Sequence, residues 1–264
     1  MGRTLCSSDW HGSELGFKVL DYLQPDDTLY FLGDAQDRGD YGIKLMNKLL
    51  LDPRIVYIKG NHDEMMANAI VDLVDHSYST FFEVQWFGNG GTHTWDSMIH
   101  MSDESKMWYV NKINDMPTEI IYHSPKGHDI ILEHAGFSPF NVQTHERNPL
   151  WDREHFDDKW FGERTYLDLD PNITYLVHGH TPVQYLTYDY NYNGKNITID
   201  EAFIKAKRAF FQDCDVAEYC PKPEVIRYCE GHKFDIDMCT ISSDRIALLD
   251  LDTFETIYFD AEEK

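Results

Sequence analysis

The chain has 264 residues, of which 42% are hydrophobic and 14% aromatic, and its formal charge at pH 7 is −23. This length allows one large domain or two small ones, and the composition is that of a folded globular protein. Non-specific binding to long nucleic acid or to an anionic membrane depends on basic patches, so the acidic balance argues against both partners. It does not exclude a phosphorylated substrate, because bound metal ions can make a local site positive.

The sequence contains no apolar run near the roughly 20 residues of a membrane span, and its N-terminus lacks the apolar region of a signal peptide. The odd number of cysteines, without regular spacing, predicts reduced thiols and a cytoplasmic location. A metal knuckle within the last part of the chain is an alternative that the irregular spacing disfavours. The cysteines are Cys6, Cys214, Cys220, Cys229 and Cys239.

The N-terminal part alternates between short apolar runs and helical patterns. This alternation predicts a parallel sheet, in which the loops beyond the carboxyl ends of the strands carry the function. The expected elements are strands at 3–8, 28–32 and 54–58 and helices at 13–23, 41–51 and 64–74.

Polar motifs follow each of these three strands. Asp9 and His11 come after the first, the sequence GDAQDRG at 33–39 after the second, and KGNHDE at 59–64 after the third. Because the strands are expected to lie side by side, we expect the three motifs to meet at one edge of the sheet.

The remainder of the chain predicts a helical region and further strands. Residues 77–115 look mainly helical, and an antiparallel pair at 119–122 and 129–132 leads to His134. The later elements expected are a strand at 173–177 leading to His178 and His180, a hairpin at 188–199, a helix at 200–211, and strands at 233–237, 245–251 and 255–259.

Aspartate, histidine and asparagine side chains at strand ends suit Mn²⁺, Fe²⁺ or Zn²⁺. A carboxylate can bridge two ions, and Asp34 is the natural bridge. Two ions roughly 3.5–4 Å apart lower the pKa of a shared water and neutralise a transferring phosphoryl group. Alone, Asp34 would be an ordinary loop carboxylate or helix cap. Its place in GDAQDRG favours a metal site in a phosphate-ester hydrolase.

The order of these motifs resembles that of the calcineurin-like metallophosphoesterases. The pair Asp37-Arg38 resembles a motif of the phosphoprotein phosphatase branch of this family, and the stretches 89–92, 134–139 and 150–154 resemble further motifs of that branch. Within the branch, the chain resembles bacterial and bacteriophage-type serine/threonine phosphatases and their relatives, the symmetrical diadenosine tetraphosphatases. The resemblance covers about residues 3–186 and 232–260.

The resemblance implies an α/β fold in which a two-sheet β-sandwich is flanked by helices. Residues 1–264 would form one domain with an insertion at about 187–231. It also implies two divalent ions, Mn first and Fe, Zn or Ni as alternatives, and in-line attack by a hydroxide that bridges them. The first ion would be held by Asp9, His11 and Asp34, and the second by Asp34, Asn61, His134 and His180.

The family pattern also assigns roles to residues that hold no metal. His62 would be the general acid, and Asp37 would fix its tautomer. Arg38 and Arg153 would clamp the phosphate oxygens, although Arg153 could instead form a structural salt bridge. Asn89 would lie near the substrate, with a tight turn at 89–91 as the alternative. His178 either supports the site or simply ends its strand.

Substrate choice is less determined, because the chain departs from the family pattern. Asp63 stands where Glu is usual, with little effect expected, and Ile236-Asp237-Met238-Cys239 stands where IDTG is usual. We expect a metal-dependent phosphomonoester hydrolase, first of all a serine/threonine phosphoprotein phosphatase. The alternatives are a dinucleoside polyphosphate hydrolase, a phosphatase or phosphodiesterase acting on nucleotides or RNA ends, and a non-catalytic scaffold that recruits partners through the insertion at 187–231.

Overall fold

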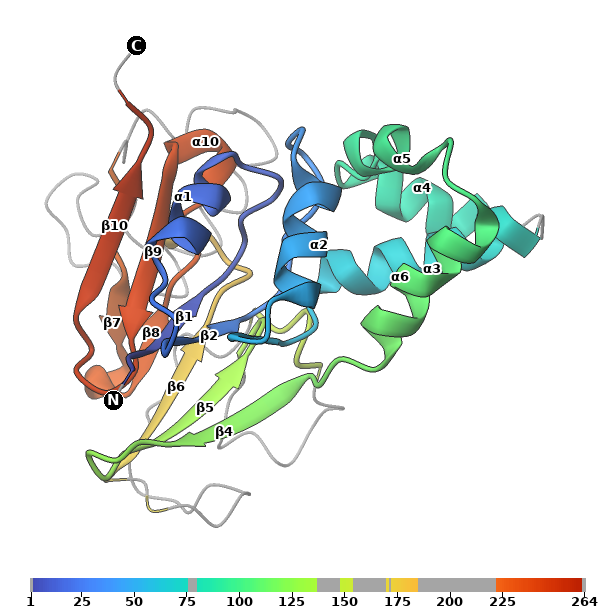
Figure 1. The fold of residues 1–264 in the computed structure, drawn as a ribbon. Coiled ribbons are helices and arrows are strands. Elements are labelled where there is room, and N and C mark those ends of the chain that lie inside the picture. The colour runs from blue at the N-terminus through green and yellow to red at the C-terminus, as the bar shows by residue number, and fades with distance from the viewer. Residues whose placement is uncertain are drawn as a thin grey trace, which may run out of the picture.

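The computed structural model describes residues 2–75, 80–136, 148–153, 170, 172–184 and 222–262. The strands of this part of the chain form two five-stranded sheets (Figure 1). Both sheets mix parallel and antiparallel pairs. The three parallel strands lie in the interior of the second sheet, whereas in the first sheet they occupy the centre and one edge. This arrangement brings the carboxyl ends of the central strands of both sheets to one edge.

The first sheet has the order β10-β9-β1-β2-β3. Its three N-terminal strands are parallel, with Leu5 opposite Leu29 and Leu29 opposite Ile55. The two C-terminal strands add in antiparallel fashion beside β1. The strands are β1 Thr4–Ser7, β2 Thr28–Phe31, β3 Ile55–Tyr57, β9 Arg245–Asp250 and β10 Thr256–Asp260.

The second sheet has the order β4-β5-β6-β8-β7, with parallel pairing from β5 to β8 and antiparallel strands at both edges. Edge strand β7 belongs to the end of the expected insertion, so that end is part of the sheet. The expected hairpin at 188–199 and helix at 200–211 lie outside the described residues. The strands are β4 Glu119–His123, β5 Asp129–Glu133, β6 Thr174–His178, β7 Ile226–Tyr228 and β8 Lys233–Asp235.

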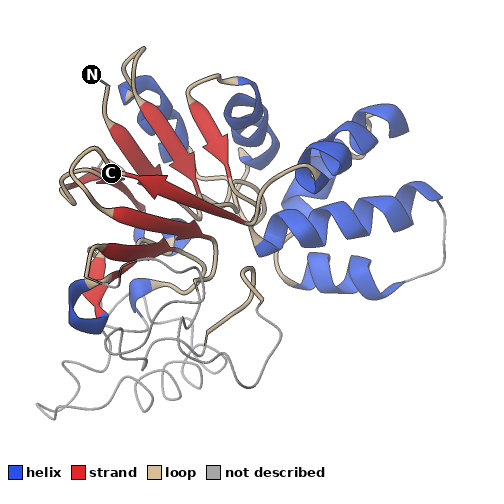
Figure 2. Ribbon diagram, turned by 90° about the horizontal axis from the view of Figure 1, so that it is seen from below, coloured by secondary structure: helices blue, strands red, loops and turns tan. Residues whose placement is uncertain are grey.

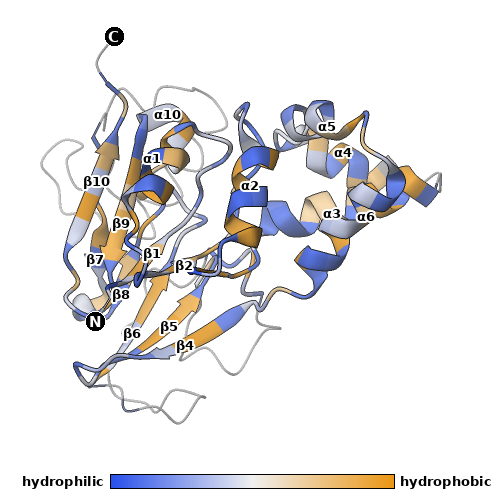
Figure 3. Cartoon of the chain, in the orientation of Figure 1, coloured by the Kyte–Doolittle hydropathy of each residue, from blue (hydrophilic) through white to orange (hydrophobic). Residues whose placement is uncertain are grey.

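The two sheets pack face to face through apolar side chains. Cys6 and Leu249 of the first sheet share one buried cluster with Leu132, Val177 and Phe234 of the second. Figure 3 shows apolar stretches along strands of both sheets, as expected for strands that face a shared core. The predicted β-sandwich is thus confirmed.

Helices cover the outer face of the first sheet and continue into a separate layer. Helices α1 (Leu15–Tyr22) and α2 (Gly42–Leu51) pack on the sheet in one core cluster with its strands. We call the region from α3 to α6 the helical lobe, and Figure 2 shows it extending away from both sheets. Its helices are α3 Asn61–Asp75, α4 Thr80–Gly88, α5 Thr92–Met98 and α6 Asp103–Asn114, and the short elements near the C-terminus are η3 Cys229–Gly231 and α10 Thr240–Ser243.

Helix α3 begins three residues earlier than its apolar pattern predicts. The backbone N–H of Glu64 donates to the carbonyl of Gly60 and closes the first turn. Asn61 and His62 therefore lie in a helical first turn rather than in a loop, and their direction is fixed by the helix. Within the described ranges, no helix combines the length and the apolar character needed to cross a bilayer.

Candidate active site

The motifs predicted from sequence meet at the carboxyl ends of strands from both sheets. The loop after β1 is fastened to the loop after β2, because the N–H of Asp9 donates to Gly33 and that of His11 donates to Asp34, at 3.1 and 3.0 Å. The end of β6 joins them, because the N–H of His180 donates to Oδ2 of Asp9 at 3.0 Å. The proposed metal ligands are all buried.

The backbone at this edge is strained at many of the predicted site residues. A positive φ is uncommon outside glycine, costs about 1–3 kcal/mol and clusters at functional sites. Six residues that the sequence pattern assigns to the site have φ between 44° and 71°, namely Asp9, His11, Asp34, Asp37, Arg38 and His180. The fold holds these side chains in directions that relaxed loops would not give them.

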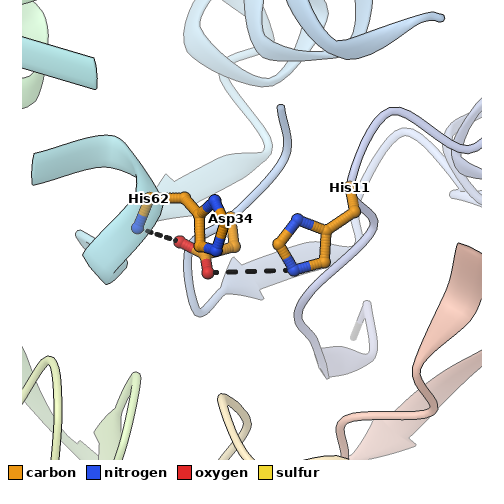
Figure 4. Close-up of side chains that lie close together, drawn as sticks. All are labelled: His11, Asp34 and His62. Carbon is orange, nitrogen blue, oxygen red and sulfur yellow. Dashed lines mark hydrogen bonds and ion pairs between the residues drawn. The ribbon is translucent and has the colours of Figure 1, made fainter. Parts of the chain in front are cut away.

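Asp9, His11 and Asp34 form the first group of potential ligands. Nε2 of His11 lies 3.8 Å from a carboxylate oxygen of Asp9 and 3.9 Å from one of Asp34. Figure 4 shows His11 and His62 on either side of Asp34. Nδ1 of His11 lies 3.1 Å from the carbonyl oxygen of Gln36, which can only accept a hydrogen bond. The proton is therefore on Nδ1, and the lone pair of Nε2 faces the two carboxylates.

Asn61, His134 and His180 form the second group, beside Asp34. Nε2 of His134 and Nδ1 of His180 lie 2.8 and 2.9 Å from Oδ1 of Asn61. Nε2 of His134 also lies 3.4 Å from Asp34, while its Nδ1 donates to the carbonyl of Leu32 at 2.6 Å. Asp34 thus faces both groups, as a bridging carboxylate must.

These donors fit divalent transition-metal ions. Oxygen and nitrogen ligands about 2.0–2.2 Å from an ion lie about 3–4 Å from each other, which matches the separations at Asp9, His11, Asp34 and His134. Among the described residues, Asp9, Asp34 and His134 form one potential metal-binding cluster, and His11, Asp34 and His62 form another. The sequence pattern assigns His62 to the substrate instead, and its ring nitrogens lie against Asp37 and Arg38 rather than against other potential ligands.

The electrostatics of the site also favour cations. Burial opposes protonation of His134, but Asp34 and Asp9 outweigh it and raise its pKa to about 10. Burial likewise opposes ionisation of Asp34, but His134 and His62 hold its pKa well below the ordinary value. Burial, followed by the charge of Arg38, lowers the pKa of His11, which keeps this imidazole neutral. The site therefore gathers carboxylates that a divalent ion would neutralise in place of a proton.

His62 is held between Asp37 and Arg38. Its Nδ1 lies 2.7 Å from Oδ2 of Asp37, and its Nε2 lies 3.1 Å from Nη2 of Arg38. A guanidinium can only donate, so Nε2 accepts and Nδ1 carries the proton. The predicted contact between Asp37 and His62 is confirmed. The exposed Arg38 marks the side of His62 from which a substrate would approach.

The other residues predicted from sequence, Arg153, Asn89 and His178, have different hydrogen-bond partners around the site. Nε of Arg153 donates to Nε2 of His180 at 2.9 Å, so Arg153 lies at the second group. Asn89 is exposed and donates to the carbonyl of Gln85, while the neighbouring Gly90 accepts from the N–H of Arg38 at 3.0 Å. His178 ends β6 with its Nε2 2.6 Å from the hydroxyl of Tyr228, and burial lowers its pKa to about 3.

Sequence reasoning gave too little weight to Asp63. Its carboxylate accepts from the backbone N–H groups of Gly60 and Asp34, at 2.8 and 3.2 Å, and from the hydroxyl of Tyr57 at 3.0 Å. Burial and the charge of Asp34 raise its pKa to about 7. An acidic residue three positions after the residue that precedes a helix is typical of a capping box, and this spacing is present in the sequence.

The chain matches the family model of the calcineurin-like phosphoesterases over residues 2–233. No curated protein matches it in sequence. Similar solved structures include a candidate diadenosine tetraphosphatase, at 14% identity and a TM-score of 0.53, covering 100% of this chain and 95% of that one. A Saccharomyces cerevisiae serine/threonine phosphatase with similarity to human PP5 is 13% identical, with a TM-score of 0.52. That match covers 100% of this chain and 81% of the other. A cold-active protein tyrosine phosphatase is 14% identical, with a TM-score of 0.51, and the match covers 95% of this chain and 74% of that one.

The chain therefore belongs to the calcineurin-like phosphoesterase family, and it is an enzyme that hydrolyses phosphate esters. Members of this family use divalent metal ions, and this chain contains matching groups of ligands. At these low identities the similar structures establish the fold and leave the substrate open. The alternative of a non-catalytic scaffold finds no support.

Proposed function

We propose that this enzyme is a serine/threonine phosphoprotein phosphatase that works with two divalent ions, Mn²⁺ first. The observation that carries the proposal is the triad of Asp37, His62 and Arg38 beside two groups of metal ligands. Serine and threonine alkoxides are poor leaving groups, so their esters need a general acid as well as charge neutralisation. The triad supplies both a proton donor and a phosphate-binding guanidinium.

Two sets of side chains would hold the ions. The first set is Asp9, His11 and Asp34, and the second is Asp34, Asn61, His134 and His180. When bound, the ions supply charge neutralisation of the phosphoryl group and acidify water at the site.

The other residues act on the substrate directly. Arg38 and Arg153 orient the phosphate through planar, charge-assisted hydrogen bonds. His62, once protonated at Nε2, gives its proton to the leaving oxygen, and Asp37 stabilises the imidazolium through Nδ1. Because Arg38 lies 3.1 Å from Nε2, the phosphate clamp and the proton donor address the same end of the substrate.

A dinucleoside polyphosphate hydrolase is the second candidate. The candidate diadenosine tetraphosphatase is matched over 95% of its length, so the two chains are similar in extent as well as in fold. Such a substrate would use the same metal ligands and the same clamp, and would differ only in contacts at the rim of the site.

Rates on a substrate panel test the proposal. With Mn²⁺, the enzyme should hydrolyse a phosphoserine peptide faster than diadenosine tetraphosphate or a 2′,3′-cyclic nucleotide, and a chelator should abolish all activity. His62→Ala should lower the rate on the peptide by roughly 10²–10⁴-fold. The exposed His93→Ala serves as the matched control and should leave it unchanged. A higher rate on diadenosine tetraphosphate would favour the second candidate, and a full rate in His62→Ala would refute the assigned general acid.

A further inference from the structure

The carboxylate of Asp37 has partners from the helical lobe in addition to His62. Nε1 of Trp86 lies 3.1 and 3.0 Å from the two oxygens of Asp37, and the hydroxyl of Thr94 donates to Oδ1 at 2.6 Å. All three side chains are buried, with exposed fractions of 0% for Asp37 and Trp86 and 1% for Thr94. These contacts join α4 and α5 to a residue that directly orients the proposed general acid.

The partners of Asp37 determine the direction of its carboxylate. A buried carboxylate is costly unless hydrogen bonds satisfy its oxygens, and it can rotate about its side-chain bonds if only one partner holds it. Thr94 and Trp86 satisfy the lone pairs that His62 does not use, so Oδ2 stays aimed at Nδ1 of His62. Removing either donor would leave the carboxylate less well directed.

Two residues of the helical lobe, Thr94 and Gly90, also hold the strained backbone at Asp37 and Arg38. The N–H of Asp37 donates to the hydroxyl of Thr94 at 2.9 Å, and the N–H of Arg38 donates to the carbonyl of Gly90 at 3.0 Å. Both donating residues have positive φ, 71° and 63°, and need such restraint to persist. A side chain at Gly91 would collide with Trp86, so glycine is required for this close approach.

We propose that Trp86 and Thr94 are positioning residues for general-acid catalysis: from the helical lobe they hold Asp37, and through it His62, in the geometry for proton transfer to the leaving group. This inference rests on the proposed role of His62. It assigns to α4 and α5 a part in catalysis that the sequence pattern did not indicate.

The dependence of the rate on the leaving group tests this role. A positioned general acid matters for a poor leaving group and little for a good one, whereas general structural damage lowers both rates together. We would compare phenyl phosphate with p-nitrophenyl phosphate, which has the better leaving group. Thr94→Val, nearly isosteric, should lower kcat on phenyl phosphate about 10-fold or more, change kcat on p-nitrophenyl phosphate less than about 3-fold, and leave KM nearly constant. Thr94→Ser should restore the wild-type pattern.

Matched variants separate the positioning role from packing. Trp86→Phe keeps an aromatic ring but removes the donor, and should behave like Thr94→Val. Thr92→Val and Trp95→Phe, in the same helix as Thr94, should change neither rate selectively. In an Asp37→Asn background the effect of Thr94→Val should disappear, because the residue through which it acts has lost its role.

The outcomes are distinguishable from failure of the proposed function. If His62→Ala affects both aryl phosphates equally, then His62 is not the general acid, and the part of the proposed function on which this inference rests fails. If His62→Ala is selective for phenyl phosphate but Thr94→Val and Trp86→Phe are not, the positioning role is overturned. A readout independent of metals is the proton NMR signal of Nδ1–H, assigned by its loss in His62→Ala. In the metal-free protein, Thr94→Val should shift or broaden this signal, and an unchanged signal would contradict the proposal.

Discussion

Single side chains at this site have unequal parts, and Asp63 shows why a motif alone does not rank them. The sequence pattern made Asn61 and His62 the working residues and gave Asp63 no task beyond its place in the motif. In the fold, Asp63 instead links the loop after β3 to the loop after β2, through Gly60 and Asp34. It therefore sets the position of the proposed bridging carboxylate.

Asp63→Ala should destabilise the protein by about 2–4 kcal/mol, because two backbone N–H groups and a buried hydroxyl lose their acceptor. Chemical unfolding of the metal-free protein measures this. Tyr57→Phe removes only one of the three donors and should cost about 1 kcal/mol. Equal losses in the two variants would mean that Asp63 does not join the loops, and a loss below about 1 kcal/mol for Asp63→Ala would contradict its structural role.

At the scale of secondary-structure elements, the site depends on how closely the end of β6 packs against the loop after β1. The end of β6 lies against the loop after β1, since the N–H of His180 donates to Asp9. Gly179 makes this possible, because a Cβ there would collide with the side chains of Asp9 and Ser8. The contact joins a strand of the second sheet to the first metal-ligand group.

Gly179→Ala should therefore weaken metal binding by at least about 10-fold, because Asp9 must move away from His11 and Asp34. Calorimetric titration of Mn²⁺ into the metal-free protein measures the affinity. Gly88→Ala is the matched control, since a Cβ at that position meets nothing within 4 Å. If both variants bind Mn²⁺ like the wild type, the contact between β6 and Asp9 does not shape the site.

The sequence was sufficient to predict which elements carry the site. Apolar runs ending at Asp9, Asp34 and Asn61 predicted parallel strands with polar loops, and β1, β2 and β3 confirm them. The contacts of Trp86 and Thr94 with Asp37 were not predictable, because they join residues 49 and 57 positions apart and depend on how the helical lobe packs. No periodic pattern or local motif carries that information.

On the scale of the whole molecule, the site belongs to both sheets. Asp9, His11 and Asp34 follow strands of the first sheet, whereas His134 and His180 follow strands of the second. At this edge, where buried carboxylates accumulate, hydrogen bonds from His180 to Asp9 and from His134 to Leu32 join the two sheets beside the apolar core. Ions bound by both sets of ligands would add a further connection between the sheets at this edge.

Metal removal should consequently lower the thermal stability of the whole domain. An ion that binds only the folded state, at 100 times its dissociation constant, contributes about 2.7 kcal/mol. For a chain of this size that corresponds to a decrease in Tm of roughly 5–10 °C when a chelator is added, reversed by excess Mn²⁺. Asp34→Asn should lose this difference in Tm, because Asp34 faces both groups of ligands. His62→Ala should keep the difference, because His62 is proposed to act on the substrate and not on the ions.

A chelator-insensitive Tm in the wild type would show that the sheets do not depend on metal. Loss of the effect in His62→Ala would make His62 a ligand, as its place in the cluster with His11 and Asp34 allows.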